Sequence, residues 1–214
     1  MRDLVICGAG GFADEVTCLV NRINAITPQW NFLGYIDKDM NTKGEKRRYG
    51  TILGDISFVN NSKVPLSVAV AIGNPARVKK VISEIHNEFV EFPNVIDPDV
   101  LFLDKDSIRI GQGNIICANC VVSCNVNIGD FNILNIGAGV GHDAIVGNYN
   151  VIMPNVNISG GVIIGESNLL GVKSTVIQYL KIGKGVTLGA NSVLMRNAKD
   201  DLLYIGNPAK KMEL

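Results

Sequence analysis

Residues 140–165 read VGHDAIVGNYNVIMPNVNISGGVIIG, and an aliphatic residue stands at every sixth position of this stretch. The same spacing extends outward until Ile, Leu or Val has occupied fifteen such positions between Ile110 and Leu194. Neither the period of about 3.6 residues of a helix nor the alternation of a strand produces this pattern. A short fixed period instead indicates a solenoid, in which each turn of the chain stacks on the one before.

The other positions of the six-residue unit indicate which kind of solenoid this is. Glycine follows the aliphatic residue in eight of the fifteen units, and the residue two places before it is mostly small or valine. These features are typical of a hexapeptide β-helix, in which three short strands per coil each direct one aliphatic side chain into a triangular core. We expect the glycines to form tight corners where φ is positive. With strands about 4.8 Å apart, about five coils would stack over roughly 24 Å.

The chain before the solenoid has the pattern of a small α/β domain. The expected elements are strands at 4–7, 32–36, 67–72 and 89–95, a loop at 38–50, and helices at 12–25 and after Gly73-Asn-Pro75. Alternating strands and helices predict a parallel sheet, here in a Rossmann-like domain. We therefore expect this domain over residues 1–98, an all-β parallel β-helix over 99–199 and a C-terminal tail over 200–214.

Composition and charge narrow the class of protein. Twenty Lys and Arg balance twenty Asp and Glu, so nothing in the charge favours a nucleic acid or a membrane surface as partner. No apolar run approaches the length of about 20 residues that a membrane span needs, and the N-terminus lacks a signal-peptide pattern. Five cysteines, an odd number, suit a reducing compartment better than a disulfide framework. We expect a cytoplasmic protein.

A glycine-rich loop lies between the first expected strand and the first expected helix. Gly8-Ala-Gly-Gly-Phe-Ala13 fits the pattern G-x-G-x-x-A, in which glycines let the backbone approach a phosphate at a helix N-terminus. The motif alone is equally compatible with NAD, a flavin, a nucleotide-sugar or a simple tight turn. The domain is too short for a complete dinucleotide fold, which favours a mononucleotide. Asp37, at the end of the second strand, is a candidate for binding the ribose or base, or a solvated turn residue.

The chain has two histidines, and they differ in context. His86 follows a polar helix and is expected at the surface. His142 lies within the repeat, which does not require a histidine, and Asp143 beside it could fix the tautomer of the imidazole. A His–carboxylate pair is the usual arrangement of a general base. Sequence alone leaves a catalytic and a structural role open.

Three cysteines in the first part of the repeat suggest a metal site at first sight. Cys117, Cys120 and Cys124 fall at different positions of successive six-residue units, so their side chains need not converge. A structural zinc ion also requires four ligands. We therefore expect no metal, and assign these residues to the core and corners.

Together these residues resemble the bacterial sugar acyltransferases that join a nucleotide-sugar-binding domain to a left-handed hexapeptide β-helix. The family includes acetyltransferases of UDP-linked 4-amino sugars, of GDP-perosamine and of sialic acid. The resemblance rests on the Gly8–Ala13 loop, the strand ending at Asp37, Ile72-Gly-Asn-Pro75, the fifteen hexapeptides, the stretch Asn135–Asp143 and Gly206-Asn-Pro-Ala-Lys210. It implies a left-handed coil, a homotrimer with active sites between subunits, and acetyl transfer from acetyl-CoA without a metal.

The resemblance also implies roles for individual residues. His142 would act as the general base, Asp143 would orient and polarise it, and Asn135 would position the acceptor. Coenzyme A would lie between subunits, in contact with Gly160, Val172 and Ala190. The nucleotide would be held by Gly8, Gly10, Gly11, Phe12, Asp37 and Asn74.

Two departures from the family pattern leave part of the function open. Many members carry Glu where this chain has Asp143, and many carry a second histidine in the next coil, where Asn150 is the polar residue nearest in sequence. The favoured function is N-acetylation of a nucleotide-linked 4-amino sugar in surface-glycan biosynthesis. The alternatives are O-acetylation of sialic acid or a related sugar, and a non-catalytic scaffold that binds a sugar nucleotide. A dehydrogenase is disfavoured, because it would explain only the glycine-rich loop.

Overall fold

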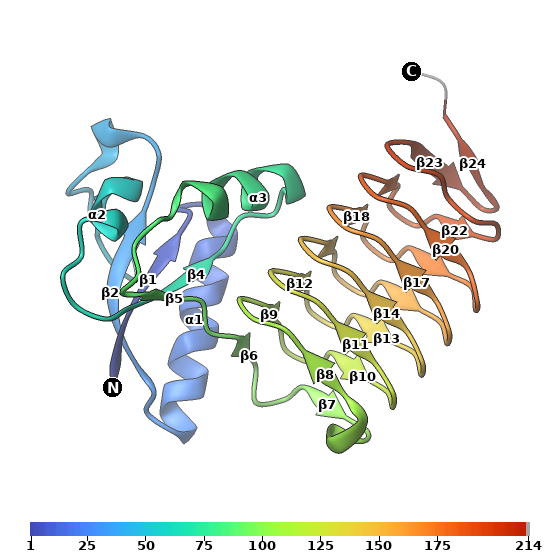
Figure 1. The fold of residues 1–214 in the computed structure, drawn as a ribbon, viewed down its shortest axis with the longest axis horizontal. Helices are drawn as coiled ribbons and strands as arrows, with labels where there is room; N and C mark the ends of the chain where they lie inside the picture. Colours follow the sequence, from blue (N-terminus) through green and yellow to red (C-terminus); the bar gives the residue numbers. More distant parts are fainter. Residues whose placement is uncertain (213–214) are drawn as a thin grey trace.

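The computed structural model describes residues 1–212 and shows an α/β domain followed by a long triangular solenoid (Figure 1). The expected fold class is confirmed: a Rossmann-like domain on a parallel sheet precedes a left-handed parallel β-helix of short stacked strands. Within residues 1–212, no helix is both long enough and apolar enough to cross a membrane.

The α/β domain is built on one parallel sheet with the strand order β3-β2-β1-β4-β5. Its strands are β1 (Arg2–Cys7), β2 (Trp30–Ile36), β3 (Ile52–Gly54), β4 (Leu66–Val70) and β5 (Val90–Glu91). Its helices are α1 (Gly11–Ile26), α2 (Ile56–Asn60) and α3 (Pro75–Glu84), with a 3₁₀ turn η1 (Met40–Thr42). The strand order reverses between β1 and β4, and the carboxyl ends of parallel strands at such a point form the usual crevice for a ligand.

Two parts of this domain differ from the sequence-based expectation. The short elements β3 and α2 were not predicted, because so few residues give no readable periodicity. The strand expected at 89–95 was wrong as one element: Phe92-Pro93-Asn94 separates β5 from β6 (Val95–Ile96), which pairs with the solenoid strand β9. Pro93 has no N–H to continue a ladder. We therefore propose the domain boundary within residues 92–94, a few residues before the expected one.

The solenoid has three faces, each a parallel sheet. The first face contains β6 (Val95–Ile96), β9 (Ile115–Ile116), β12 (Ile133–Leu134), β15 (Val151–Ile152), β18 (Leu169–Leu170), β21 (Thr187–Leu188) and β23 (Leu203–Gly206), closed by the antiparallel β24 (Ala209–Lys211). The second contains β7 (Leu101–Phe102), β10 (Val121–Val122), β13 (Gly139–Val140), β16 (Asn157–Ile158), β19 (Thr175–Val176) and β22 (Val193–Leu194). The third contains β8 (Arg109–Ile110), β11 (Asn127–Ile128), β14 (Ile145–Val146), β17 (Ile163–Ile164) and β20 (Lys181–Ile182), and a 3₁₀ turn η2 (Lys105–Ser107) precedes β8.

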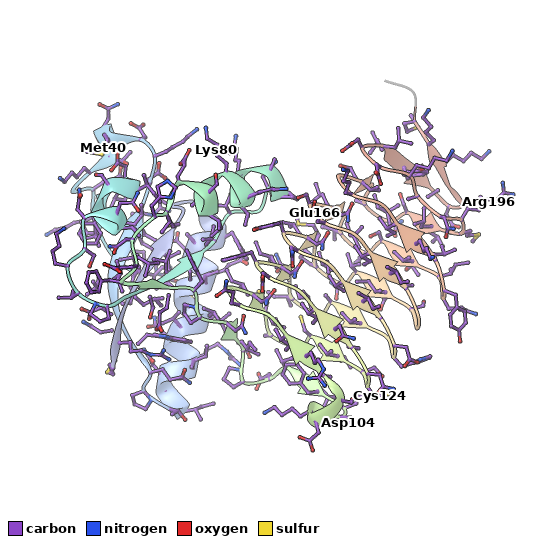
Figure 2. The ribbon with its side chains drawn as sticks, viewed as in Figure 1. Met40, Lys80, Asp104, Cys124, Glu166 and Arg196 are labelled. Atoms are coloured by element: carbon purple, nitrogen blue, oxygen red, sulfur yellow. The ribbon has the colours of Figure 1, made fainter. Side chains whose placement is uncertain are left out.

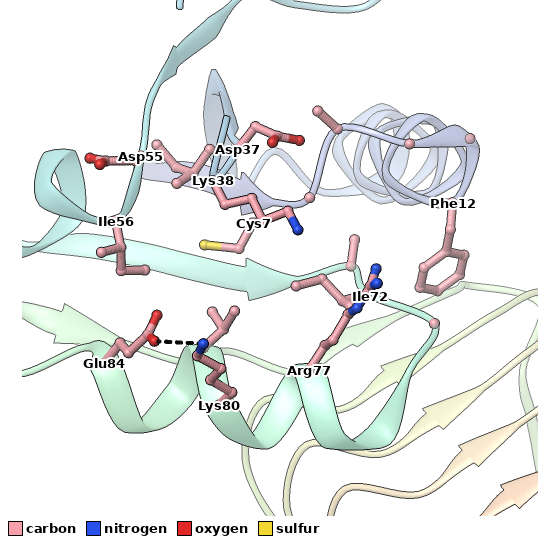
Figure 3. A pocket seen from close by; sticks show the side chains of 18 residues that line it. Cys7, Phe12, Asp37, Lys38, Asp55, Ile56, Ile72, Arg77, Lys80 and Glu84 are labelled. Atoms are coloured by element: carbon pink, nitrogen blue, oxygen red, sulfur yellow. Dashed lines mark ion pairs between the residues drawn. The ribbon is translucent and has the colours of Figure 1, made fainter. Parts of the chain in front are cut away.

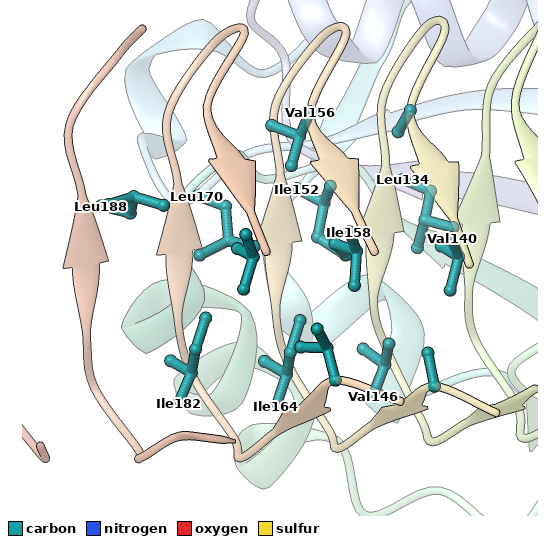
Figure 4. Close-up of a cluster of buried hydrophobic side chains, with 14 of the residues drawn as sticks. Leu134, Val140, Val146, Ile152, Val156, Ile158, Ile164, Leu170, Ile182 and Leu188 are labelled. Atoms are coloured by element: carbon teal, nitrogen blue, oxygen red, sulfur yellow. The ribbon is translucent and has the colours of Figure 1, made fainter. Parts of the chain in front are cut away.

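We name the edges by the faces they join: the first corner joins the first and second faces, the second corner the second and third, and the third corner the third and first. The second residue of each strand points inward. Figure 4 shows Leu134, Val140 and Val146, one from each face of a single coil, within the same core. The six-residue period is therefore confirmed as one inward side chain per face.

The corners do not use glycine in the way we expected. In the units from Ile110 to Leu188, positive φ falls three residues after the inward aliphatic, as at Asn125 (φ 55°), Asp143 (φ 59°) and Gly161 (φ 66°). The glycines that directly follow the aliphatic residues do not have positive φ. They are required by close stacking of the coils instead: a Cβ on Gly147 would lie 2.5 Å from the carbonyl oxygen of Gly165.

A ladder of four buried asparagines runs through the third corner, at Asn114, Asn132, Asn150 and Asn168. Each lies 18 residues from the next, and the side-chain oxygen of one accepts from the backbone N–H and the Nδ2 of the next. Asn150 Nδ2 also donates to the carbonyl oxygen of Gly165 at 2.9 Å. The ladder supplies the hydrogen bonds that the buried corner backbone needs.

Replacing Asn150 by Ala is expected to lower the free energy of unfolding by roughly 2–4 kcal/mol, because donors and acceptors on three neighbours lose their partner inside the core. Urea unfolding at fixed protein concentration measures the change. Asn157→Ala, at an exposed position on the second face, is the matched control. Equal stability of the two variants would contradict a stabilising role of the ladder.

The two domains are joined by apolar packing and a partly buried ion pair. α1 contributes Val16 and Leu19 to a cluster with Ile115 and Ile133, which point outward from the first face. Arg22 of α1 donates to Asp97 at 2.9 Å, and Asp97 is only 3% exposed. The first face of the solenoid is therefore the one covered by the α/β domain.

Candidate active site

A cavity of about 790 Å³ opens at the carboxyl ends of β1, β2 and β4 (Figure 3). Five of the six residues predicted to hold a nucleotide line it: Gly8, Gly10, Gly11, Phe12 and Asp37. Its opposite wall is α3, from which Arg77, Lys80 and Glu84 contribute. The cavity therefore coincides with the crevice that the strand order predicts.

The glycines of the loop serve different purposes. Gly8 has a φ of +116°, and a Cβ there would lie 2.6 Å from the carbonyl oxygen of Ala71. A Cβ at Gly10 or Gly11 would face open space, with no atom from beyond the neighbouring backbone within 4 Å. Gly10 is the N-cap of α1, and no side chain caps this helix. The first N–H groups of α1 are therefore available to an anion in the cavity.

The charged side chains of the cavity differ in the contacts that they already make within the chain. Asp37 Oδ1 accepts from the backbone N–H of Asp39 at 2.9 Å. Asp55 caps α2 through Ser57, whose side-chain and backbone hydrogen bonds lower the pKa of Asp55. Lys80 and Glu84 are paired at 3.8 Å. Among the described residues, Arg77 makes no ion pair with a carboxylate.

Asn74 has a different position from the other predicted nucleotide contacts. Its Oδ1 accepts from the backbone N–H of Arg77 at 3.0 Å, which makes Asn74 the N-cap of α3. It borders a separate groove between α3 and the solenoid rather than the cavity. A nucleotide in the cavity would therefore depend on Asn74 through the position of α3.

His142 lies on the second corner, and its ring is held from one side. Its Nδ1 is 2.7 Å from Asp143 Oδ2, and Asn125 Nδ2 donates to Asp143 Oδ1 at 3.1 Å. These two contacts hold the pKa of Asp143 below its ordinary value, with the hydrogen bond to His142 the larger cause. Because Asp143 is anionic at neutral pH, it favours the tautomer in which Nδ1 carries the proton and Nε2 is a free base.

Gly160 lies one coil beyond His142 at the same corner. A Cβ on Gly160 would come within 2.4 Å of His142 Nε2. The ring therefore lies against the backbone of the next coil, and only glycine leaves room for it. This places one of the three predicted coenzyme A contacts directly beside the predicted base.

The remaining predicted residues lie on another edge of the solenoid. Asn135, Val172 and Ala190 all belong to the first corner, between the first and second faces. Asn135 Oδ1 accepts from the N–H of Ile136 at 2.7 Å, and its Nδ2 makes no hydrogen bond to another described residue. One chain therefore brings His142, Asp143 and Gly160 together but keeps Asn135 apart from them.

The structure also shows the environment of Asn150 and of two cysteines whose roles the sequence left open. Asn150 is completely buried in the ladder, so it does not stand in for a second active-site histidine. Burial raises the pKa of Cys117 to about 12 and that of Cys120 to about 11, so both thiols stay protonated. No group of three His, Cys, Asp or Glu within residues 1–212 could hold a metal ion.

Two residues of the site were missed in the sequence. Asn125 precedes Asp143 by 18 residues, one full coil, so the repeat length places them in contact. Arg77 follows the cap of α3 by three residues, on the first turn of the helix. The 18-residue length of one coil could have predicted the contact of Asn125 with Asp143. The position of Arg77 on the first turn could have been predicted from the helix cap at Asn74.

Comparison with known proteins gives a consistent picture over the whole chain. Residues 3–85 match the family model described as the PglD N-terminal domain. The fold is similar to that of the acetyltransferase domain of PglB from Neisseria gonorrhoeae FA1090, at 29% identity and a TM-score of 0.87, over 99% of this chain and 100% of that one. A second structure of that domain, at 28% identity and a TM-score of 0.88, is a complex with acetyl coenzyme A.

Two further solved structures have the same arrangement. PerB from Caulobacter crescentus, in complex with CoA and GDP-perosamine, is 27% identical with a TM-score of 0.82, over 100% of this chain and 98% of that one. WeeI from Acinetobacter baumannii AYE is 25% identical with a TM-score of 0.87, over 99% of this chain and 100% of that one. No curated protein sequence gave a significant match.

Proposed function

Because the chain belongs to the hexapeptide-repeat sugar acetyltransferases and is thus an acyltransferase, we propose that it acetylates the amine of a nucleotide-linked 4-amino sugar, with acetyl-CoA as donor. The observation that carries this proposal is the pair His142–Asp143, held at 2.7 Å on a corner whose repeat does not require either residue. A cavity with free helix N–H groups in the same chain supplies a place for the nucleotide.

In this mechanism His142 takes one proton from the acceptor amine through Nε2. The amine nitrogen attacks the thioester carbonyl, a C–N bond forms, and the C–S bond breaks. The imidazolium then returns its proton to the departing thiolate. Asp143 stabilises the imidazolium, in the way a buried or oriented carboxylate assists a histidine base.

The two halves of this site would come from different chains. The α/β domain covers the first face, and His142 lies on the second corner, which is the edge opposite that face. Figure 2 shows the separation: Lys80 of α3 and Cys124, directly beneath His142 on the second corner, lie on opposite sides of the molecule. We therefore propose that a neighbouring subunit supplies His142 to each nucleotide cavity, in a closed homotrimer.

A smaller cavity of about 290 Å³ supports this arrangement. It shares Gly11 with the nucleotide cavity, continues along α1 past Glu15, and ends at Ala118 and Ile136 on the first corner. A sugar attached to the nucleotide would follow it toward Asn135. Val172 and Ala190 continue the same corner, so coenzyme A would lie between this edge and Gly160 of the neighbour.

The proposed function is tested by thiol release from acetyl-CoA with UDP-, dTDP- and GDP-linked 4-amino sugars, and with free sialic acid. We expect turnover with one of the amino sugars. Turnover with sialic acid alone would replace the proposal by O-acetylation. No turnover with any acceptor, in a protein that still binds a sugar nucleotide, would favour the non-catalytic scaffold.

A further inference from the structure

The carboxylate of Asp143 is held on both of its oxygens, although the pair that it forms with His142 is open to solvent. Within one chain the side chains of His142 and Asp143 are 54% and 57% exposed, so packing does not fix their geometry. Oδ2 lies 2.7 Å from His142 Nδ1, and Oδ1 accepts from Asn125 Nδ2 at 3.1 Å. An exposed charged pair with a single contact competes with water and gains little. The contact with Asn125 therefore matters for the orientation of the carboxylate.

The backbone of Asn125 is supported by the 3₁₀ turn η2 in the first coil of the solenoid. The Asn125 N–H donates to Ser107 Oγ at 2.8 Å, and the Ser107 hydroxyl donates to the carbonyl oxygen of Asp104 at 3.0 Å. In the next coil the corresponding N–H, that of Asp143, donates to the backbone carbonyl of Cys124 instead. Figure 2 shows Asp104, the N-cap of η2, close to Cys124, the residue before Asn125. The inserted turn thus fixes Asn125 from the coil below.

The conformation and the chemistry of Asn125 also suit this contact. Its φ is 55°, a left-handed conformation that Asn adopts more readily than most residues. Because a carboxylate only accepts hydrogen bonds, the amide must turn its NH₂ group toward Asp143. Asn125 is exposed, so the core does not require an amide at this position. The one hydrogen bond of its side chain to another described residue goes to the partner of His142.

We propose that Asn125 is a positioning residue: it holds the Asp143 carboxylate in the orientation that keeps the proton of neutral His142 on Nδ1 and leaves Nε2 free. The inference rests on the proposed function for the use that is made of Nε2, but not for the tautomer itself. Asn125 acts through Asp143 and not on either substrate. Its loss should therefore lower kcat and leave the affinity for both substrates unchanged.

Two substitutions of Asn125 separate this role from the need for a left-handed residue at the corner. Asn125→Gly removes the amide, and glycine adopts positive φ freely. We expect kcat to fall roughly tenfold, as for a lost hydrogen bond to a charged group, with dissociation constants within about twofold of the wild type. Asn125→Asp keeps the shape and also tolerates positive φ, but two carboxylates then face each other. Its kcat at neutral pH should fall further than that of Asn125→Gly.

A cycle of substitutions tests whether Asn125 acts through Asp143. In an Asp143→Gly background the carboxylate is absent, so adding Asn125→Gly should lower kcat by no more than about twofold. Asp201→Gly is the control for a substitution at a corner. Asp201 is left-handed, with φ 55°, and is exposed on the third corner, so its loss should leave kcat unchanged. Melting temperatures near that of the wild type establish that each variant is folded.

The tautomer of His142 can be measured without acetyl transfer. The chain has two histidines, so ¹⁵N-labelled histidine gives two sets of ring signals, and the exposed His86 serves as an internal reference. At a pH where the imidazole is neutral, we expect the Nδ1–H tautomer of His142 to predominate in the wild type. Its share should fall in Asn125→Gly, while the signals of His86 stay unchanged.

The outcomes distinguish this inference from the proposed function. The inference is overturned if His142 of the wild type carries its proton mainly on Nε2, or if the tautomer is unchanged in Asn125→Gly. In a protein that acetylates an acceptor, it is also overturned by wild-type kcat in Asn125→Gly or Asn125→Asp, or by an equal loss in the Asp143→Gly background. A tautomer that depends on Asn125, in a protein that acetylates no acceptor, supports the orientation of His142 by Asn125 and contradicts the proposed function.

Discussion

His142→Ala is expected to lower kcat for acetyl transfer roughly 10²–10⁴-fold, the range typical of a lost general base. The dissociation constants of both substrates should stay within about threefold, because the imidazole acts on the proton and not on nucleotide or coenzyme affinity. The structural basis is that Nδ1 is held by Asp143 at 2.7 Å, which leaves Nε2 as the free basic atom. Initial rates of thiol release, with calorimetry for binding, measure the two effects separately.

The control for this prediction is His86→Ala. His86 is exposed and follows α3 on the α/β domain, away from the second corner, so its loss should leave kcat unchanged. Asp143→Asn then tests the role of the carboxylate. Asn tolerates positive φ well, so this substitution removes the charge without straining the corner, where φ is 59°. A kcat for His142→Ala within about threefold of the wild type would show that another group is the base.

The sequence predicted the solenoid well because a single steric requirement repeats in it. Each face admits one inward aliphatic side chain, and the next face begins six residues later, so β8 to β22 follow directly from the spacing. The first two strands of the solenoid, β6 and β7, were not identified as repeats because the spacing of the first coil is irregular. Ile96 and Phe102 are six residues apart, but η2 inserts extra residues before Ile110. An aliphatic period cannot be read across such an insertion.

The purpose of the glycines could not be read from their positions alone. Both the left-handed conformation and close backbone approach favour glycine. The coil places its left-handed residues three positions after the inward aliphatic, where only some units have Gly, as at Gly161 (φ 66°), and others have residues such as Asn155 (φ 57°) and Tyr149 (φ 60°). Where a glycine does follow the inward aliphatic, as in eight of the fifteen units, the next coil stacks closely against it. Only coordinates show which requirement applies.

The proximity of the candidate site residues could be predicted from the sequence where they share a corner of the solenoid. Where they lie on different corners, their spacing in the sequence suggested a proximity that does not exist within one chain. His142 and Asp143 are consecutive, and Gly160 follows His142 by one coil, so their proximity follows from the repeat. Asn135 is only seven residues from His142 in sequence but belongs to a different edge of the prism. Since one coil visits three corners, nearness in sequence does not mean nearness in space here. In the proposed trimer, the site becomes complete when the first corner of one chain meets the second corner of another.

Mixed trimers test that arrangement, and a large recovery of activity is expected. One chain carries His142→Ala and keeps its nucleotide cavity. The other carries Gly10→Phe, which places a large side chain at the cavity: Gly10 has φ −93°, which any residue adopts, and a Cβ there has open space around it. Each variant alone should be inactive, the first for lack of a base and the second for lack of a bound nucleotide.

Trimers that contain both chains, isolated through two different affinity tags, should regain about one third of the wild-type activity per trimer. In a closed ring with two chain types, one of the three junctions places an intact cavity against an intact His142. If instead the cavity and His142 of the same chain formed the site, no junction would be functional, and the mixed trimers would stay as inactive as their parents. The result therefore depends on the position of His142 on the edge opposite the α/β domain, and not on the strength of any single contact.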